Sequence, residues 1–150
     1  MNTIVRQINF DMDGTLCDFY GVEGWLDDLN NYDTRPYAIA KPLLNLSVLA
    51  RYLNKLQNKG YTINIISWLS KTSTADFDER VTRVKLEWLK KHLKSVKFDN
   101  ITIISYGTPK QNFGKGILFD DETKNRDNWV GLAYDEKNIL EILKNLLTNA

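Results

Sequence analysis

The sequence predicts an α/β fold built on an open parallel sheet. Short apolar segments rich in Ile, Val, Leu and Phe alternate along the chain with longer amphipathic segments. Nearly continuous apolar runs are typical of strands buried on both faces, as in parallel sheets. Parallel strands need crossover connections, which are right-handed, so we expect helices packed on the faces of the sheet.

Five segments are predicted to be strands, because each is a short run dominated by apolar residues. They are Ile4–Phe10, Tyr61–Trp68, Ile101–Tyr106 and Ile117–Phe119, with Val130–Ala133 as a weaker fifth.

Helical spacing of apolar residues predicts the first long helix. Its apolar face carries Leu46, Leu49, Leu53 and Leu56. Gly60 stands where a left-handed C-terminal cap is needed.

Two further helices follow from the same spacing. Asp76 can cap the start of the second, with Glu79 three residues on. Asp135 can cap the start of the last helix. The apolar stripes of these two helices are Phe77, Val81, Val84 and Trp88, and Ile139, Ile142, Leu143 and Leu146.

A segment at about 18–41 breaks this alternation, and we expect it to form a small lid over the sheet. We find no internal repeat or linker, so residues 1–150 are predicted to form one domain with this lid as an insertion. The lid segment is rich in aromatic and turn-forming residues: Tyr20, Gly21, Gly24, Trp25, Tyr32, Pro36 and Tyr37.

Composition excludes several classes of protein. With 20 Lys+Arg against 19 Asp+Glu, the net charge of +1 excludes a globally basic nucleic-acid coat and a polybasic membrane surface. The single cysteine, Cys17, allows neither an intramolecular disulfide nor a multi-cysteine zinc site. No apolar run approaches the ~18 residues that span a bilayer. We expect a soluble, cytoplasmic protein.

The first strand ends in the motif D-x-D-G-T at residues 11–15. In open α/β sheets ligands bind outside the carboxyl ends of the strands, so a site is expected here. Mutual repulsion and a nearby cation would separate the pKa values of Asp11 and Asp13, which suits one for nucleophilic attack and the other for proton transfer. A calcium-binding loop also begins with D-x-D, but its later ligand and glycine positions do not match this sequence.

This motif resembles the first motif of the haloacid dehalogenase (HAD) superfamily, and three further motifs match in order. Ser67 ends the second strand, Lys110 lies shortly before the fourth, and Asp120 and Asp121 follow the fourth. The resemblance covers about residues 4–145. It implies a HAD-type Rossmann-like three-layer fold with a parallel sheet and a minimal cap.

The resemblance implies a Mg²⁺-dependent phosphomonoester hydrolase. Asp11 would attack phosphorus to form an aspartyl-phosphate, and Asp13 would protonate the leaving oxygen and then activate water. The implied Mg²⁺ ligands are Asp11, the Asp13 backbone carbonyl and one of Asp120 or Asp121. We favour Asp121, with Asp120 holding Lys110.

A phosphate cradle is implied as well. Lys110 would neutralise phosphoryl charge, and Ser67 would donate a hydrogen bond to a phosphoryl oxygen. Backbone N–H groups at Met12 and Trp68 would complete the cradle. In this superfamily an Asp two residues after the nucleophile marks phosphatases, so Asp13 favours phosphoester hydrolysis.

Residues 11–21, DMDGTLCDFYG, look most like the 5′(3′)-deoxyribonucleotidase branch. Phe19, Tyr20 and Trp25 could then stack on a base or wall its pocket, although packing of a small lid onto the sheet explains them equally well. That branch carries a longer helical cap than this chain can form. We expect an open site that accepts a nucleotide or another small phosphomonoester.

Two alternatives stay open. HAD phosphatases of polynucleotides and proteins also have trimmed caps, and a basic groove would favour such a substrate. The other alternative is a non-catalytic Mg²⁺- or phosphate-binding module on the same fold. A second subunit acting as a lid is also compatible with an open site. Four lysines could form such a groove: Lys90, Lys91, Lys94 and Lys97. A run of lysines like this one is usually a solvated helix face.

Overall fold

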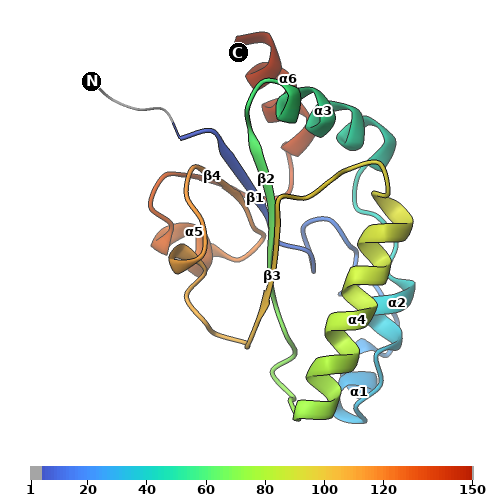
Figure 1. Cartoon of the computed structure of the whole chain (residues 1–150). Helices are drawn as coiled ribbons and strands as arrows, with labels where there is room; N and C mark the ends of the chain where they lie inside the picture. Colours follow the sequence, from blue (N-terminus) through green and yellow to red (C-terminus); the bar gives the residue numbers. More distant parts are fainter. Residues whose placement is uncertain (1–4, 150) are drawn as a thin grey trace.

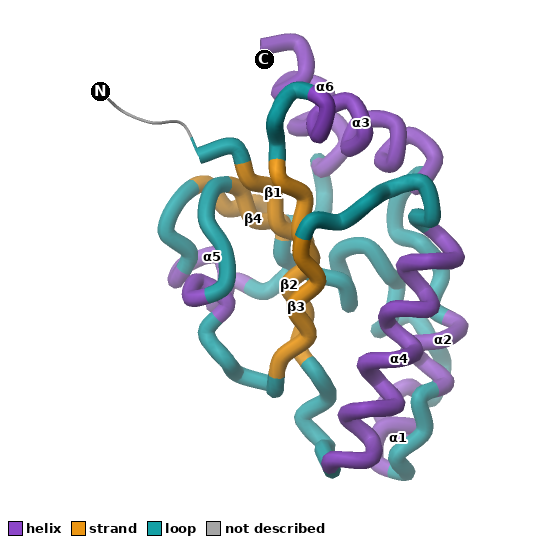
Figure 2. The backbone as a smooth tube through the Cα atoms, viewed as in Figure 1, coloured by secondary structure: helices purple, strands orange, loops and turns teal. Residues whose placement is uncertain are grey.

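In the computed structural model, which describes residues 5–149, five parallel strands lie in the order β3-β2-β1-β4-β5 (Figures 1 and 2). The central strand β1 (Gln7–Phe10) pairs with β2 (Thr62–Trp68) and with β4 (Ile117–Phe119). The edges are β3 (Asn100–Ile104) and β5 (Leu132–Tyr134). Because all pairs are parallel, every strand ends at the same edge of the sheet. The predicted fold class is confirmed.

Helices cover both faces of the sheet and make a three-layer structure. On one face lie α3 (Leu46–Asn58), α4 (Ala75–His92) and α6 (Ile139–Asn149). On the other lie α5 (Thr123–Asn128) and the short 3₁₀ helix η1 (Lys110–Asn112). Figure 1 shows α5 across the sheet from α4.

The central strands are buried on both faces. Ile8 and Phe10 of β1 belong to the large core formed with α3, α4 and α6. Ile66 of β2 and Leu118 of β4 pack with Trp129 on the α5 side. Side chains alternate in this way because successive residues of a strand point to opposite faces. Each such buried side chain contributes roughly 1.5–3 kcal/mol.

Three asparagines form a hydrogen-bonded row across β1, β2 and β3. Asn64 Nδ2 donates to Asn9 Oδ1, and Asn100 Nδ2 donates to Asn64 Oδ1, each over 3.1 Å. Asn9 Nδ2 donates in turn to the carbonyls of Lys115 (2.7 Å) and Ile117 (3.0 Å). Because buried amides need hydrogen-bond partners, this row ties the segment between η1 and β4 to the sheet.

Several predicted strands and helices are present but begin or end at other residues than predicted. β1 begins at Gln7, and Ile4 of the predicted strand lies outside the described residues. β3 ends at Ile104 rather than Tyr106. Gly60 follows α3 with a φ of +96°, the left-handed conformation expected of a C-terminal cap.

The predicted cap of α4 is wrong. Thr74, not Asp76, caps the helix, and its side chain accepts a hydrogen bond from the Phe77 N–H (3.1 Å). Thr74 has the extended backbone that lets a side chain reach back over the first turn. Asp76 lies inside that turn and instead forms an ion pair with Arg80 (3.0 Å).

The last strand and helix both begin later than predicted. β5 begins at Leu132, because the Val130 side chain is 81% exposed and lies outside the strand ladder. Asp135 does not cap α6. Its carboxylate accepts a hydrogen bond from the Lys137 N–H (2.9 Å) in a local turn, and the helix begins only at Ile139.

The lid segment contains two short helices, α1 (Trp25–Asn30) and α2 (Arg35–Ile39). Phe19 and Tyr37 of this segment pack against the buried start of α4. Figure 1 shows α1 beside the first turns of α4 and α2 beside its middle, toward the end of the sheet where β2 and β3 terminate. The insertion therefore lies next to the edge where a site is expected.

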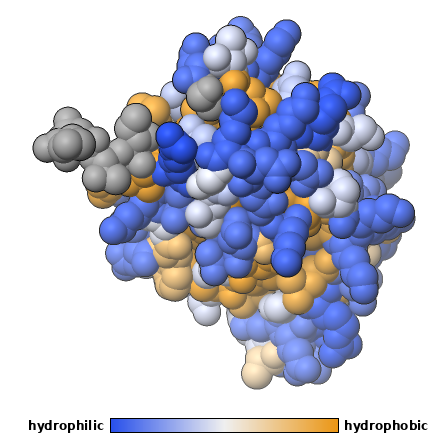
Figure 3. Space-filling view, turned by 45° about the horizontal axis from the view of Figure 1, so that its top comes forward, coloured by the Kyte–Doolittle hydropathy of each residue, from blue (hydrophilic) through white to orange (hydrophobic). Residues whose placement is uncertain are grey.

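No helix within residues 5–149 is both long and apolar enough to cross a bilayer. The face shown in Figure 3 is largely hydrophilic, with hydrophobic residues gathered between the polar ones below its centre.

Candidate active site

The turn after β1 brings the first motif to the carboxyl edge of the sheet. The N–H groups of residues 15, 16 and 17 all point at the Met12 carbonyl oxygen, at 3.1, 2.9 and 3.0 Å. Gly14 has a φ of +84°, and a Cβ at this position would lie 2.3 Å from Asp121 Oδ2. Glycine is therefore required here, both by the backbone conformation and by the approach of the second acidic motif.

Three carboxylates from two strand ends meet at this edge. Asp11, Asp120 and Asp121 each offer an oxygen, and these oxygens all lie within 4.8 Å of one another. The Thr15 hydroxyl lies 3.0 Å from Asp11 Oδ2 and 3.3 Å from Asp121 Oδ1. Clustered carboxylate oxygens are hard ligands that suit Mg²⁺, so these residues could hold that ion.

Lys110 lies between two of the carboxylates. Its Nζ is 2.8 Å from Asp11 Oδ1 and 2.8 Å from Asp120 Oδ2, and the side chain is buried. Asp120 also accepts hydrogen bonds from Asn125 Nδ2 (3.1 Å) and from the Glu122 N–H (3.0 Å). Asp120 thus has two protein donors besides Lys110, which fits its predicted role of holding that lysine.

Burial and charge separate the pKa values of these acids. Burial alone would raise the pKa of Asp11, but Lys110 and a hydrogen bond with Asp121 outweigh it and lower that pKa. Burial, together with the hydrogen bond and charge of Asp11, raises the pKa of Asp121 to about 8. Burial and the Asp11 charge raise that of Asp120 to about 6. At neutral pH, without a metal ion, Asp11 is therefore ionised beside a protonated Asp121.

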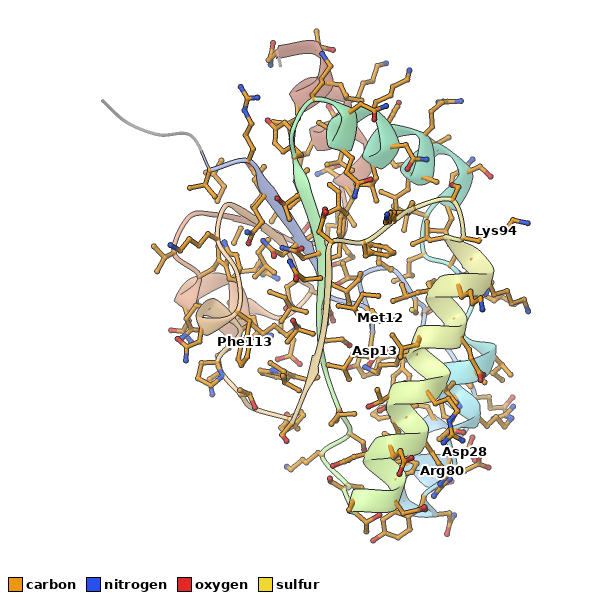
Figure 4. The ribbon with its side chains drawn as sticks, in the orientation of Figure 1. Met12, Asp13, Asp28, Arg80, Lys94 and Phe113 are labelled. Carbon is orange, nitrogen blue, oxygen red and sulfur yellow. The ribbon has the colours of Figure 1, made fainter. Side chains whose placement is uncertain are left out.

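Asp13 lies on the α4 side of the site (Figure 4), where it meets a residue that the sequence analysis missed. Its Oδ2 accepts a hydrogen bond from Lys85 Nζ at 2.8 Å. Burial raises the pKa of Asp13, and Asp11 adds to the rise, while Lys85 opposes it. The available signal was spacing, because Lys85 stands four residues after Val81 on the apolar stripe of α4.

Ser67 is brought to the site but does not line its cavity. The side chain is completely buried, and its Oγ accepts a hydrogen bond from Lys85 Nζ (2.6 Å). Its role as a donor to phosphate stays a prediction. Met12 is also buried in the core, so only its backbone can face a ligand.

A cavity of about 340 Å³ opens above the acidic cluster. Its floor includes Asp11, Asp13 and Asp121. Ser70, also on its wall, is buried and makes no side-chain hydrogen bond of standard geometry within residues 5–149. Six aromatic residues also line the cavity: Phe19, Tyr20, Trp25, Tyr37, Trp68 and Tyr106.

The aromatic residues of the lid divide into two kinds. Phe19 is buried, with its ring centroid 4.6 Å from that of Tyr37, so it packs within the lid. Tyr20 is 49% exposed and meets Trp25 edge-on at 5.2 Å. Trp68, which also lines the cavity, donates through Nε1 to the Thr108 carbonyl (2.8 Å). Phe19 therefore packs inside the lid, and stacking of Tyr20 or Trp25 on a base stays a prediction.

The C-terminal lysines of α4 form no groove at this site. They are exposed and lie at or beyond the end of α4, which runs opposite to the strands and so ends near the amino edge of the sheet. Figure 4 shows Lys94 at that end of the helix, away from Asp13. The four residues are Lys90, Lys91, Lys94 and Lys97.

Comparisons with known proteins find a relative in structure only. No protein-family model and no curated protein matches the chain. Among solved structures it is similar to the D,D-heptose 1,7-bisphosphate phosphatase from B. bronchiseptica, crystallised with magnesium and phosphate. The TM-score is 0.58 at 10% sequence identity, covering 97% of this chain and 99% of that one. The chain therefore shares the α/β fold of that phosphatase, and its own acidic cluster lies at the carboxyl edge of the parallel sheet.

Proposed function

We propose that this protein is a Mg²⁺-dependent phosphomonoester hydrolase that acts through an aspartyl-phosphate. The observation that carries the proposal is the environment of Asp11. This carboxylate is paired with Lys110 at 2.8 Å and lies within 4.8 Å of Asp120 and Asp121 at the cavity floor. The magnesium and phosphate bound to the structurally similar heptose bisphosphate phosphatase support the same assignment.

Each residue has a defined role in the proposed reaction. A carboxylate oxygen of Asp11 forms a bond to phosphorus as the ester P–O bond breaks, and Asp13 gives a proton to the departing oxygen. Asp13 then takes a proton from the water that hydrolyses the acyl phosphate. Lys110 neutralises charge on the phosphoryl group. Mg²⁺, held by Asp11, Asp121 and the Asp13 carbonyl, would supply further charge neutralisation when bound.

The cavity wall supports a flat leaving group, and we propose a nucleotide. Tyr20, Trp25 and Trp68 present aromatic surface above the acidic floor. Stacking of a base on such side chains is worth ~1–3 kcal/mol. We do not propose a polymeric substrate, because the lysines at the end of α4 lie away from the site and form no basic groove there.

Phosphate release from a panel of phosphomonoesters tests the proposal. The panel contains 5′- and 3′-deoxynucleotides, ribonucleotides, sugar phosphates and a 3′-phosphorylated oligonucleotide, each with and without Mg²⁺. We expect Mg²⁺-dependent release that is greatest with mononucleotides and disappears in Asp11→Asn. Release from sugar phosphates alone would refute the nucleotide assignment. Retained ligand binding without release from any substrate would indicate a binding module.

A further inference from the structure

Lys85, in the middle of α4, uses its whole hydrogen-bonding capacity inside the protein. Its Nζ donates to Asp13 Oδ2 (2.8 Å), Ser67 Oγ (2.6 Å) and the Trp68 carbonyl (2.7 Å). An ammonium group has three protons and no acceptor, so none remains for a substrate. Lys85 is also only 1% exposed. It therefore has no hydrogen bond to offer a substrate, and it acts on the chemistry through the residues around it.

The position of this ammonium is rigidly determined. Two of its acceptors belong to consecutive residues at the end of β2, which is paired on both sides in the sheet. The Tyr37 ring of the lid covers it, with Nζ 5.0 Å from the ring centroid. Charge-assisted hydrogen bonds to fixed acceptors leave Lys85 Nζ little freedom to move.

Asp13, whose carboxylate is one of the three groups that Lys85 holds, lies at the cavity. Its side chain is 18% exposed, and it contributes to the cavity floor. Lys85 occupies Oδ2, whereas no described residue donates a hydrogen bond to Oδ1. The carboxyl group is thus held by one oxygen and presents the other to the cavity.

From this geometry we infer that Lys85 is a positioning residue for proton transfer by Asp13. The inference rests on the proposed phosphatase function and adds a residue that belongs to none of the four motifs. Lys85 ties Oδ2 to the end of β2, so that Oδ1 stays within hydrogen-bond reach of the leaving oxygen. Small displacements of a reacting group are costly, on the order of 10²-fold for 1 Å, so this anchor sets the rate of a step that needs the proton.

The structure also explains why a lysine is tolerated among apolar residues here. Val81 and Trp88, neighbours of Lys85 on the same face of α4, are buried in the core. A buried ammonium is unfavourable unless it is paired and hydrogen-bonded. Asp13, Ser67 and the Trp68 carbonyl meet that requirement, so Lys85 and the first motif stabilise each other's placement.

The test compares leaving groups. An alkyl phosphate, the best ester of the panel above, needs a proton on its leaving oxygen, whereas 2,4-dinitrophenyl phosphate does not. The ratio kcat/KM reports only the steps up to departure of the leaving group. Activation of water by Asp13 comes later and therefore does not affect this ratio. For Lys85→Met we expect a loss on the order of 10²-fold with the alkyl ester. With the dinitrophenyl ester we expect a change of less than about threefold.

Two variants control this comparison. Lys91→Met removes the same charge from an exposed position of α4 and should leave both substrates unaffected. Lys85→Arg keeps a cation next to Asp13 and should recover part of the alkyl-ester activity. It also serves as the test if Lys85→Met fails to fold, which thermal unfolding would reveal.

The outcomes distinguish failure of the positioning role of Lys85 from failure of the proposed phosphatase function. An equal loss with both esters in a folded Lys85 variant, or no loss with either, would overturn the positioning role while leaving the phosphatase intact. If the wild-type protein releases phosphate from neither ester, the proposed function falls and the role of Lys85 falls with it.

Discussion

Lys110 Nζ lies 2.8 Å from Asp11 Oδ1, although 99 residues separate the two in the sequence. The ion pair is buried, and it opposes the effect of burial on the pKa of Asp11. Asp11 therefore stays ionised as the proposed nucleophile. The same ammonium lies close to where the phosphoryl group must approach Asp11.

Replacing Lys110 tests this dual role. Lys110→Met removes the cation from Asp11 and from the phosphoryl group, so we expect kcat to fall by about 10²–10³-fold. The matched control is Lys115→Met, an exchange in the loop after η1 that leaves the site intact. Steady-state kinetics with the best substrate provides the measurement. Wild-type activity in Lys110→Met would remove this lysine from the mechanism.

Binding of Mg²⁺ should depend on pH. Asp121 has a pKa of about 8 without metal, and a ligand carboxyl must lose its proton to bind the ion. Below about pH 8 we expect Mg²⁺ affinity to fall by roughly tenfold for each pH unit. Isothermal titration calorimetry between pH 6 and 9 measures the slope. Affinity that does not change over this range would contradict the protonated state of Asp121.

Stability of the metal-free protein should decrease as pH rises from 5 to 8. Folding raises the pKa of Asp120 to about 6 and that of Asp121 to about 8, so between pH 5 and 8 the folded chain keeps protons that the unfolded chain has released. Folding raises the pKa of Asp13 in the same direction. Because the unfolded state binds fewer protons, the free energy of unfolding falls with pH. The lowered pKa of Asp11 matters only below pH 4, its ordinary value being 3.8.

Thermal unfolding with and without Mg²⁺ measures this effect. We expect a lower Tm at pH 8 than at pH 5 without metal, and a larger gain from Mg²⁺ at pH 8. His92 acts in the opposite direction, because burial lowers its pKa. Comparison with Asp121→Asn isolates the contribution of Asp121. A wild-type Tm that follows the variant at every pH would show that Asp121 contributes nothing.

We expect Tyr20 to contribute to substrate binding and Phe19 to contribute to the stability of the fold. Tyr20→Ala removes a half-exposed ring from the cavity wall, so we expect KM for a nucleotide to rise by about fivefold or more, with little change in Tm. Phe19→Ala removes a buried ring, so we expect it to cost about 3–5 kcal/mol of stability. Denaturant unfolding and steady-state kinetics on both variants test this division. A destabilised Tyr20→Ala with unchanged KM would favour a purely structural lid.

The sequence determined the parts of the site that depend on local pattern. Asp11 and Asp121 follow apolar strands, and parallel strands must end at one edge, so their meeting could be predicted before the structure was known. The class of fold followed from the same alternation of strands and amphipathic segments. Lys110 could also be predicted as a site residue, because it lies between the second and fourth motifs where the family pattern has its lysine.

Only the tertiary structure shows which residues Lys85 binds and which aromatic residues of the lid face the cavity. Spacing puts Lys85 on the buried face of α4, but only the packing of that helix against β2 places its ammonium beside Asp13 and Ser67. Equally, spacing could not say that Phe19 packs inside the lid while Tyr20 faces the cavity. Periodicity specifies the direction of a side chain relative to its own helix or strand, whereas contact requires the position of a second element, which is set by packing of the whole chain.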